Sequence, residues 1–237
     1  MDYIEKNLSL IREKINKAVL NRDNKYNGEV RLLAATKTVG AEKINFAINK
    51  GVNLIGESKV NEFLEKYDKI NKDNLEIHFI GNLQTNKVKY IIDKVSLIQS
   101  VNSVRLAEEI NKRAEQKNII MNVLVELNIG GEESKIGIKP EAAFEFINAL
   151  KDFKNLSVKG LMTIPPPVIN AKNSQKTPGI NKFFNKMYEI FIDISSKKID
   201  NINMRFLSMG MSDDFEEAIL HGANIVRIGT AIFGDRI

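Results

Sequence analysis

Lys37 is the residue of this chain whose position most clearly suggests chemistry. It follows the apolar run at residues 32–35 in the segment "RLLAATKTVG", so it stands at the far end of a predicted buried strand. The simpler interpretation is a surface lysine with a packed stem and a solvated ammonium, because lysine is almost never fully buried unless it is paired or used. When partial burial or a nearby positive charge lowers its pKa, however, a lysine becomes a nucleophile that forms a Schiff base with an aldehyde.

Hydroxyl residues and glycines gather at the ends of the last two predicted strands, in the segments "FLSMGMSDD" and "NIVRIGTAIFG". Glycine lets the backbone approach a ligand closely, and free amides at a helix start favour an anion, although both glycines could simply serve tight turns. We therefore expect a phosphate site with Arg227 on the same rim, built from Ser208, Gly210, Ser212, Gly229 and Thr230. A lysine that faces a phosphate site suits a ligand with both an aldehyde and a phosphate. Pyridoxal phosphate (PLP) carries both groups.

The elements that must position these residues alternate regularly along the chain. Stretches with helical spacing separate apolar runs of strand length near residues 30–36, 52–55, 77–81, 96–101, 120–128, 156–162, 203–208 and 224–229. Strands that alternate with helices predict an α/β fold with a parallel sheet. Eight such units without a linker predict a single (β/α)8 TIM barrel over residues 1–237, with an extra N-terminal helix. An open doubly wound sheet is the alternative.

Local signals predict several element boundaries. Ser103 is a good N-cap, Pro140 suits a first turn, and Ser212 before acidic residues predicts another helix start. Gly222 should follow the last turn of that helix. The segment at residues 163–179 is long, polar and proline-rich, which predicts a loop over one rim of the barrel.

In a barrel, Lys37 becomes a candidate functional residue, because the active sites of such barrels lie at the carboxyl ends of the strands. Polar residues stand at all eight predicted strand ends: Lys37, Glu57, Asn82, Asn102, Asn128, Thr163, Ser208 and Arg227. Each could be an ordinary cap between a strand and a helix. Eight that converge on one rim favour a polar pocket.

Composition argues against several other classes of protein. The chain of 237 residues has no cysteine, which rules out disulfides and thiolate catalysis and is compatible with a reducing cytoplasm. Its net charge of +5 comes mainly from lysines spread along the chain, so we expect no nucleic-acid partner. No apolar run is long enough to cross a membrane, the N-terminus lacks the apolar core of a signal peptide, and we expect a cytoplasmic protein. The two histidines are distant in sequence and make a weak metal site.

The chain resembles the YggS/PROSC family of pyridoxal phosphate homeostasis proteins over nearly its whole length. The matching segments are "LLAATKTV", "IGESKVNEF", "IHFIGNLQTNK", "VLVELNIGGEESKIGI", "GLMTIPP", "LSMGMSDDFEEAI" and "VRIGTAIFG". The resemblance implies a barrel like the N-terminal domain of alanine racemase, without the second domain of the racemase. Ser58 departs from the Asn that the family usually has after Gly-Glu.

The resemblance also implies roles for individual residues. It implies a Schiff base between PLP and Lys37, a phosphate held by Ser208 and by the segment of Gly229 and Thr230, and Arg227 facing the pyridine nitrogen. No catalytic residue and no metal ligand is expected. The expected cofactor-binding residues are Lys37, Asn82, Ser208, Ser212, Arg227, Gly229 and Thr230.

Arg227 bears on whether the protein is an enzyme. A guanidinium cannot accept a proton, so at the pyridine nitrogen it would weaken the cofactor as an electron sink, whereas enzymes that exploit the full sink use an acidic partner. Alternatively, Arg227 could pair with Glu57 or Asp213. We expect a non-catalytic PLP carrier or buffer in vitamin B6 homeostasis, monomeric or weakly dimeric, with PLP-dependent apo-enzymes as recipients. The alternatives are a weak amino-acid racemase and a Schiff-base lyase that acts on a phosphorylated aldehyde.

Overall fold

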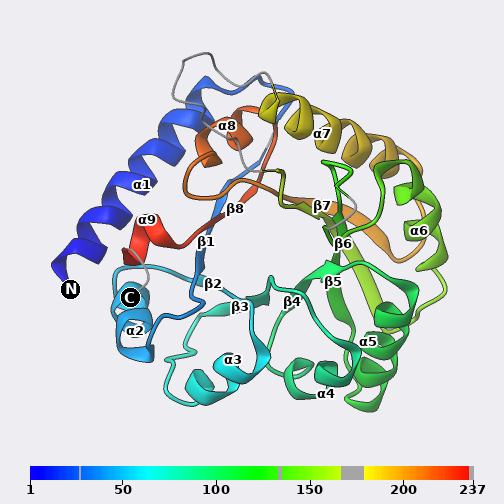
Figure 1. Ribbon diagram of the computed structural model, residues 1–237, viewed down its shortest axis with the longest axis horizontal. Helices are drawn as coiled ribbons and strands as arrows, with labels where there is room; N and C mark the ends of the chain where they lie inside the picture. Colours follow the sequence, from blue (N-terminus) through cyan, green and yellow to red (C-terminus); the bar gives the residue numbers. More distant parts are fainter. Residues whose placement is uncertain (27, 133–134, 167–178, 235–237) are drawn as a thin grey trace.

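Eight parallel strands form a closed barrel in sequence order, with β8 paired to β1 (Figure 1). The structure, a computed structural model, describes residues 1–26, 28–132, 135–166 and 179–234. The strands are β1 (Arg31–Ala35), β2 (Leu54–Glu57), β3 (Glu76–Phe79), β4 (Leu97–Val101), β5 (Met121–Leu127), β6 (Leu156–Thr163), β7 (Ile202–Ser208) and β8 (Ile225–Ile228). The predicted barrel is therefore confirmed, and the open doubly wound sheet is wrong.

Helices surround the barrel, and an additional helix precedes the first strand, as expected. They are α1 (Asp2–Asn21), α2 (Ala41–Asn49), α3 (Val60–Tyr67), α4 (Val88–Ile91), α5 (Val104–Gln116), α6 (Ala143–Ala149), α7 (Ile180–Ser196), α8 (Phe215–Leu220) and α9 (Thr230–Phe233). Short 3-10 turns, η1 (Thr85–Lys87) and η2 (Pro140–Ala142), precede α4 and α6. Helix α1 lies on the outside of the barrel and packs against α8 and α9 (Figure 1). None of the helices in the described part of the chain is long and apolar enough to span a bilayer.

Most of the local boundary signals are confirmed. The Ser103 hydroxyl accepts a hydrogen bond from the Leu106 amide at 3.3 Å and caps α5. Pro140 opens η2, and Gly222 follows α8 with a φ of +95°. The expected helix start at Ser212 is wrong. Helix α8 begins three residues later, because residues 211–214 form a turn in which the Asp214 carboxylate accepts from the Met211 amide at 2.6 Å.

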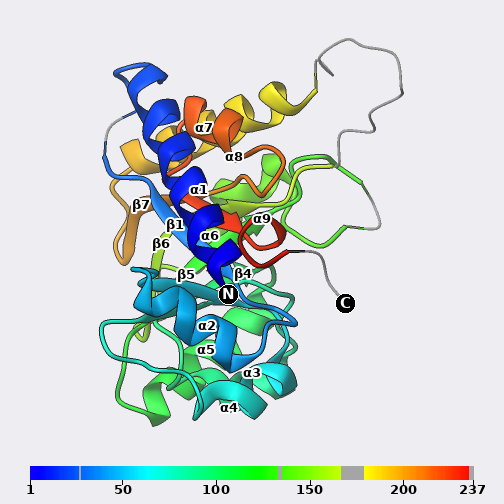
Figure 2. The same cartoon turned by 90° about the vertical axis from the view of Figure 1, so that its left-hand side faces the viewer.

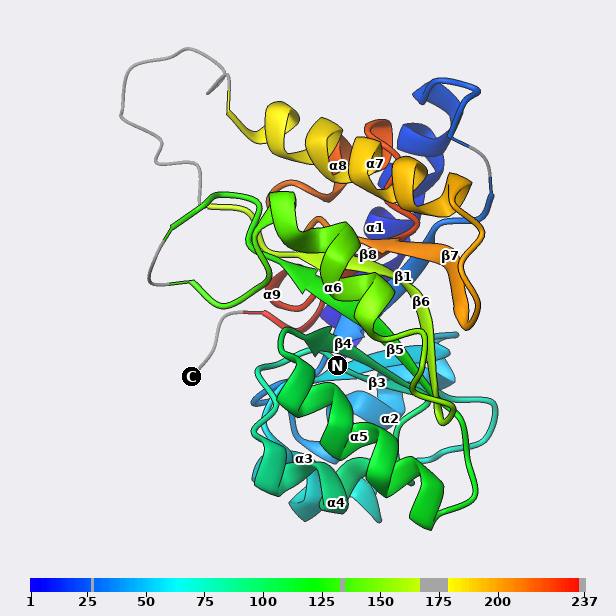
Figure 3. The same ribbon diagram turned by 90° about the vertical axis from the view of Figure 1, so that its right-hand side faces the viewer.

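The register of the sheet brings three turns together at the carboxyl end of the barrel. Ala34 of β1 lies opposite Ile228 of β8, and Ala35 lies opposite Gly56 of β2. The turn after β1 therefore runs between the turns that follow β2 and β8. Helix α9 lies at this end of the barrel in both side views (Figures 2 and 3). Most of the predicted loop at 163–179 falls in residues 167–178, outside the described residues.

The barrel interior combines apolar and polar layers. Leu33, Leu54 and Ile225 form one apolar cluster, and Leu97, Leu124 and Met162 form a second, with Phe206 packed against both. The larger core lies elsewhere and contains the buried faces of the helices. Several polar side chains share the interior with these clusters, and their hydrogen bonds determine the shape of the site.

Candidate functional site

A cavity of about 570 Å³ opens where the turns after β1, β2, β3, β6, β7 and β8 meet. This volume lies within the range of about 300–1,000 Å³ that is common for small-molecule sites. Residues from all six turns line it: Ala35, Lys37, Thr38, Val39, Gly40, Glu42, Lys43, Ser58, Ile80, Gly81, Ile164, Met211, Ser212, Asp213, Arg227, Gly229, Thr230, Phe233 and Gly234. The structure therefore brings five of the seven predicted cofactor-binding residues to one cavity.

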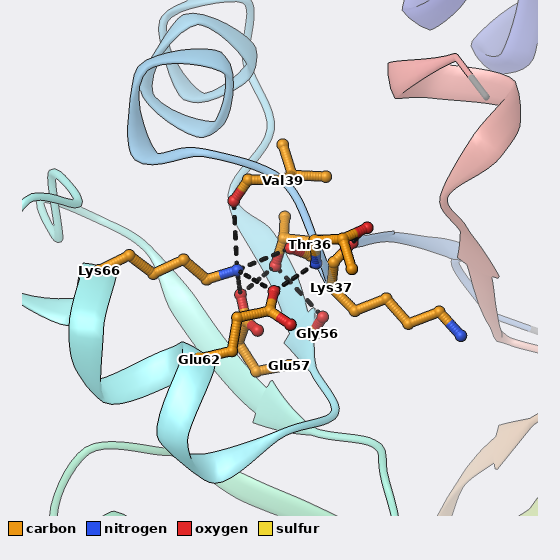
Figure 4. A network of polar contacts seen from close by, with 8 residues as sticks. Thr36, Lys37, Val39, Gly56, Glu57, Glu62 and Lys66 are labelled. Carbon is orange, nitrogen blue, oxygen red and sulfur yellow. Dashed lines mark hydrogen bonds and ion pairs between the residues drawn. The ribbon is translucent and has the colours of Figure 1, made fainter. Parts of the chain in front are cut away.

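Lys37 lines the cavity from a turn with unusual backbone geometry. The next residue, Thr38, has a φ of +62°, in the left-handed region that a β-branched residue rarely adopts. The Thr38 amide donates to the Glu62 carboxylate, and its hydroxyl donates to the Lys37 carbonyl at 2.6 Å. The side chain of Lys37 extends away from these contacts (Figure 4). Backbone atoms of the turn therefore take part in these hydrogen bonds, and the Lys37 side chain points away from them.

The Lys66 side chain of α3 binds the same turn on the side away from the Lys37 side chain (Figure 4). Its ammonium donates to the Thr36 carbonyl at 2.7 Å and to the Val39 carbonyl at 3.2 Å, on either side of Lys37. It also lies 2.9 Å from Glu57 Oε1 and 3.1 Å from Glu62 Oε1. We call Lys66, Glu57 and Glu62 the Lys66 clamp. A buried ammonium needs such a full set of partners.

Glu57 is the buried carboxylate of the Lys66 clamp. Its side chain is fully inaccessible, and burial raises its pKa, while the Lys66 charge and the Thr36 hydroxyl at 2.5 Å oppose that rise. The second oxygen, Oε2, has no hydrogen-bond partner among the described residues. Glu57 pairs with Lys66, so the proposed pairing of Glu57 with Arg227 is wrong.

A pair of hydroxyl groups, Ser212 and Thr230, lies at the start of α9, next to the turn after β1. The Thr230 hydroxyl donates to Ser212 Oγ at 3.1 Å, and the Ala231 amide donates to the same oxygen at 3.4 Å. Gly229 lies beside β1, where a Cβ would stand 3.2 Å from the Ala35 carbonyl oxygen. This surface offers hydroxyl and backbone donors next to a position where a side chain would crowd β1.

Arg227 reaches the cavity from the barrel interior, where it is almost fully buried. Its guanidinium donates to Ser208 Oγ at 2.7 Å and to the Thr163 carbonyl at 2.8 Å. Burial lowers the pKa of Arg227 to about 10, while the charges of Asp214 and Glu126 oppose that shift, so the group stays cationic at neutral pH. The alternative pairing with Asp213 is wrong: among the described residues the Arg227 guanidinium bonds to Ser208 and Thr163, and Asp214 and Glu126 act on it through their charge.

Ser208 and Asn82 differ from expectation. Ser208 is fully buried, and its hydroxyl donates to Gln99 Oε1 at 2.7 Å while it accepts from Arg227. Its one proton is therefore directed into the barrel, and a direct bond from that hydroxyl to a phosphate does not fit this geometry. Asn82 is exposed, and the described residues that line the cavity include its neighbour Gly81 instead. Ser58 lines the cavity, packed against Gly81.

Other polar residues at strand ends have structural or electrostatic roles. The Asn128 side chain donates to the carbonyls of Glu132 and Lys135 and so holds the loop after β5. Burial raises the pKa of Glu126 to about 7, with the Arg227 charge and an Asn102 hydrogen bond opposing the rise. Sequence reasoning missed Glu126 and Lys66. The spacing of four residues between Glu62 and Lys66 on one helix was the available signal for the second.

The fold and this cavity define a class: a parallel (β/α)8 barrel with lysine, arginine and hydroxyl side chains around one opening at its carboxyl end. The sequence matches the family "Alanine racemase, N-terminal domain" over residues 3–237. A pyridoxal phosphate homeostasis protein of Aquifex aeolicus is 44% identical over 229 residues, which cover 97% of this chain and 96% of the relative. The chain therefore belongs to the alanine racemase N-terminal domain family and, within it, to the group of the pyridoxal phosphate homeostasis proteins.

Solved structures share the fold. PipY of Synechococcus elongatus, in its structure with PLP bound, is 24% identical with a TM-score of 0.80, over 98% of this chain and all of PipY (100%). An alanine racemase of Clostridium difficile is 17% identical with a TM-score of 0.75, over 99% of this chain but only 57% of the racemase. The racemase thus extends well beyond the part that this chain resembles.

Proposed function

We propose that residues 1–237 act as one PLP-binding domain that holds the cofactor through Lys37. The observation that carries this proposal is the shared cavity: Lys37 lines it from the turn after β1, and Ser212, Gly229 and Thr230 line it from the turns after β7 and β8. An aldehyde and a phosphate on one small molecule need an amine and a group of hydrogen-bond donors in one cavity. The PLP bound to PipY and the name of the Aquifex aeolicus relative support the same ligand.

Each residue has a distinct part in this proposal. Lys37 would hold the cofactor by supplying the amine for a Schiff base with its aldehyde, a C=N bond formed with loss of one water. The Ser212 hydroxyl, which accepts from Thr230 and keeps its own proton, and the backbone at Gly229 would donate hydrogen bonds to the phosphate. Thr230 is exposed, so its hydroxyl would turn from Ser212 to the phosphate when the ligand binds. Arg227 would face the pyridine nitrogen and would stay cationic at neutral pH. Bound PLP would supply a reactive aldehyde and an electron sink.

A carrier or buffer fits these residues better than an enzyme. A racemase needs a second group that can donate and accept a proton at the cofactor. Arg227 cannot accept a proton, and no tyrosine that could serve as this second group is among the described residues that line the cavity. The racemase, in contrast, contains a large part that this chain does not match. In the proposed role the protein limits free aldehyde in the cytoplasm and passes PLP to apo-enzymes.

Absorption spectra of two lysine variants test the attachment. Lys37 and Lys43 both line the cavity, so Lys43→Ala is a matched control for Lys37→Ala. After incubation with PLP and gel filtration, the wild type and Lys43→Ala should retain the protein-bound chromophore, and Lys37→Ala should lose it. Full retention by Lys37→Ala would refute the assignment of Lys37.

A transfer assay tests the carrier role. The loaded protein is mixed with an aminotransferase from which PLP has been removed, and recovery of aminotransferase activity is followed over time. Recovery supports a carrier or buffer. If the aminotransferase stays inactive while free PLP restores it, the carrier role is wrong.

A further inference from the structure

A line of four buried polar side chains crosses the barrel interior and ends at Arg227. Arg227 Nη1 lies 2.7 Å from Ser208 Oγ, Ser208 Oγ lies 2.7 Å from Gln99 Oε1, and Gln99 Nε2 lies 2.9 Å from His78 Nδ1. The four residues come from β8, β7, β4 and β3, and all are at most 4% exposed. His78 Nε2 in turn lies 3.5 Å from Glu76 Oε2. The line therefore links the cavity to a carboxylate near the other end of the barrel.

The hydrogen bonds of this line run in one direction from Arg227 to His78. A guanidinium only donates, so Ser208 accepts from Arg227, and the structure directs the single proton of Ser208 to Gln99 Oε1. Gln99 then accepts with its carbonyl oxygen, and its NH₂ group must face His78. His78 Nδ1 must accept, which leaves the ring proton on Nε2, facing Glu76. Burial lowers the pKa of His78, while Glu76 opposes that shift and Arg31 of β1 adds to it, which agrees with a neutral ring.

We propose that Ser208, Gln99 and His78 are positioning residues that fix the orientation of the Arg227 guanidinium at the cavity. Two anchors define the plane of the guanidinium: Ser208 on Nη1 and the Thr163 carbonyl on Nη2. These two bonds use two of its five N–H donors, so the group can be held by the barrel and still face a ligand. The proposal rests on the proposed function only where it concerns PLP.

The tautomer of His78 tests the line without any ligand. Nitrogen-15 NMR of the ligand-free protein distinguishes a protonated from an unprotonated ring nitrogen, and His221, the second of two histidines, is assigned with a His221→Gln variant. The proposal predicts an unprotonated Nδ1 and a protonated Nε2 in the wild type. In the opposite tautomer, His78 Nδ1 would donate, so the amide oxygen of Gln99 would face His78 in place of its NH₂ group. That result would overturn the proposal.

Two serine variants test whether the line acts as a unit. Ser208→Ala removes the group that orients Gln99, so the His78 nitrogen resonances should shift or broaden. Ser100→Ala is the matched control, because Ser100 Oγ is equally buried and, within the described residues, has no hydrogen-bond partner. Its His78 resonances should stay as in the wild type. Unchanged His78 resonances in Ser208→Ala would overturn the proposal, because Gln99 would then not transmit the orientation.

The affinity for PLP supplies the second readout. Ser208→Ala should bind PLP about ten-fold more weakly, since it removes a bond to a charged group, and Ser100→Ala should bind like the wild type. If Ser208→Ala bound PLP as tightly as the wild type, the positioning role would be wrong even if the His78 tautomer were as predicted. If no form binds PLP while the tautomer is as predicted, the proposed function fails and the hydrogen-bonded line stands.

Discussion

Replacing Lys66 with Met should destabilise the fold strongly and loosen the turn that carries Lys37. The variant loses hydrogen bonds to Thr36 and Val39 and the ion pairs to Glu57 and Glu62. It also leaves Glu57 without its cation, although the carboxylate is fully inaccessible. Removing one partner of a buried ion pair costs about 3–5 kcal/mol, a large part of the roughly 5–15 kcal/mol that holds a typical domain together.

Urea unfolding followed by circular dichroism measures this loss. The matched control is Lys14→Met, because Lys14 also forms an ion pair at 2.9 Å, with Glu216, but both side chains are about half exposed, at 45% and 46%. An exposed pair is worth about 0–1 kcal/mol, so the control should lie close to the wild type. Equal losses for the two variants would refute the assignment of the Lys66 clamp.

A double-mutant cycle with Glu57→Gln isolates the interaction between the two charges. The double variant Glu57→Gln with Lys66→Met removes both charges and should be more stable than the sum of the single losses implies, by about 1–3 kcal/mol. Additive losses would contradict the reasoning.

The pH dependence of Lys66→Met has a definite sign. Burial raises the pKa of Glu57 in the folded protein while the Lys66 charge opposes that rise, so loss of Lys66 raises the pKa further and the folded variant takes up a proton more readily than the wild type. Protonation therefore favours folding, and the deficit of Lys66→Met should shrink as the pH falls toward the ordinary range of a glutamate. A deficit that grows in acid would contradict this account.

Three further results are expected. Burial raises the pKa of Glu126 from 4.5 to about 7, so the wild type loses stability as the pH rises through that window. Glu126→Gln should therefore gain up to about 3 kcal/mol at pH 8 and nothing near pH 4 in urea unfolding, and an equal difference at both pH values would contradict it. Thr230→Val should weaken PLP binding by about ten- to a hundred-fold without changing the binding of pyridoxal, and equal losses for both ligands would exclude a phosphate contact. Amino acids in deuterated solvent should exchange their α-protons with the loaded protein far more slowly than ordinary enzymes turn over, and rates near ~10 per second would restore the racemase alternative.

The barrel could be predicted from the sequence because each strand carries its own local signal. The run that ends at Lys37 was an apolar segment in a regular alternation, and β1 (Arg31–Ala35) appears where that run predicts it. The closure of the sheet followed from the number of units. The position of Lys37 near Gly229 then followed from the general rule that strand ends converge in such barrels.

The contacts of the site depend on side chains that are distant in the sequence. Lys66 reaches Thr36 across 30 positions, and Ser208 reaches Gln99 across 109, so no local pattern could pair them. Ser212 failed as a predicted helix start because Asp214 formed a competing turn, which left the Ser212 hydroxyl to accept from Thr230. Only the register of the strands determines which of these groups face the cavity and which face the barrel.

Reduction with borohydride tests the central claim most directly. The protein is loaded with PLP, reduced and digested, and the modified peptide is identified by mass spectrometry. The account predicts one pyridoxyl adduct, on Lys37 in the peptide that contains "AATKTVG". An adduct on Lys43, which lines the same cavity, or on any other lysine in place of Lys37 would contradict it.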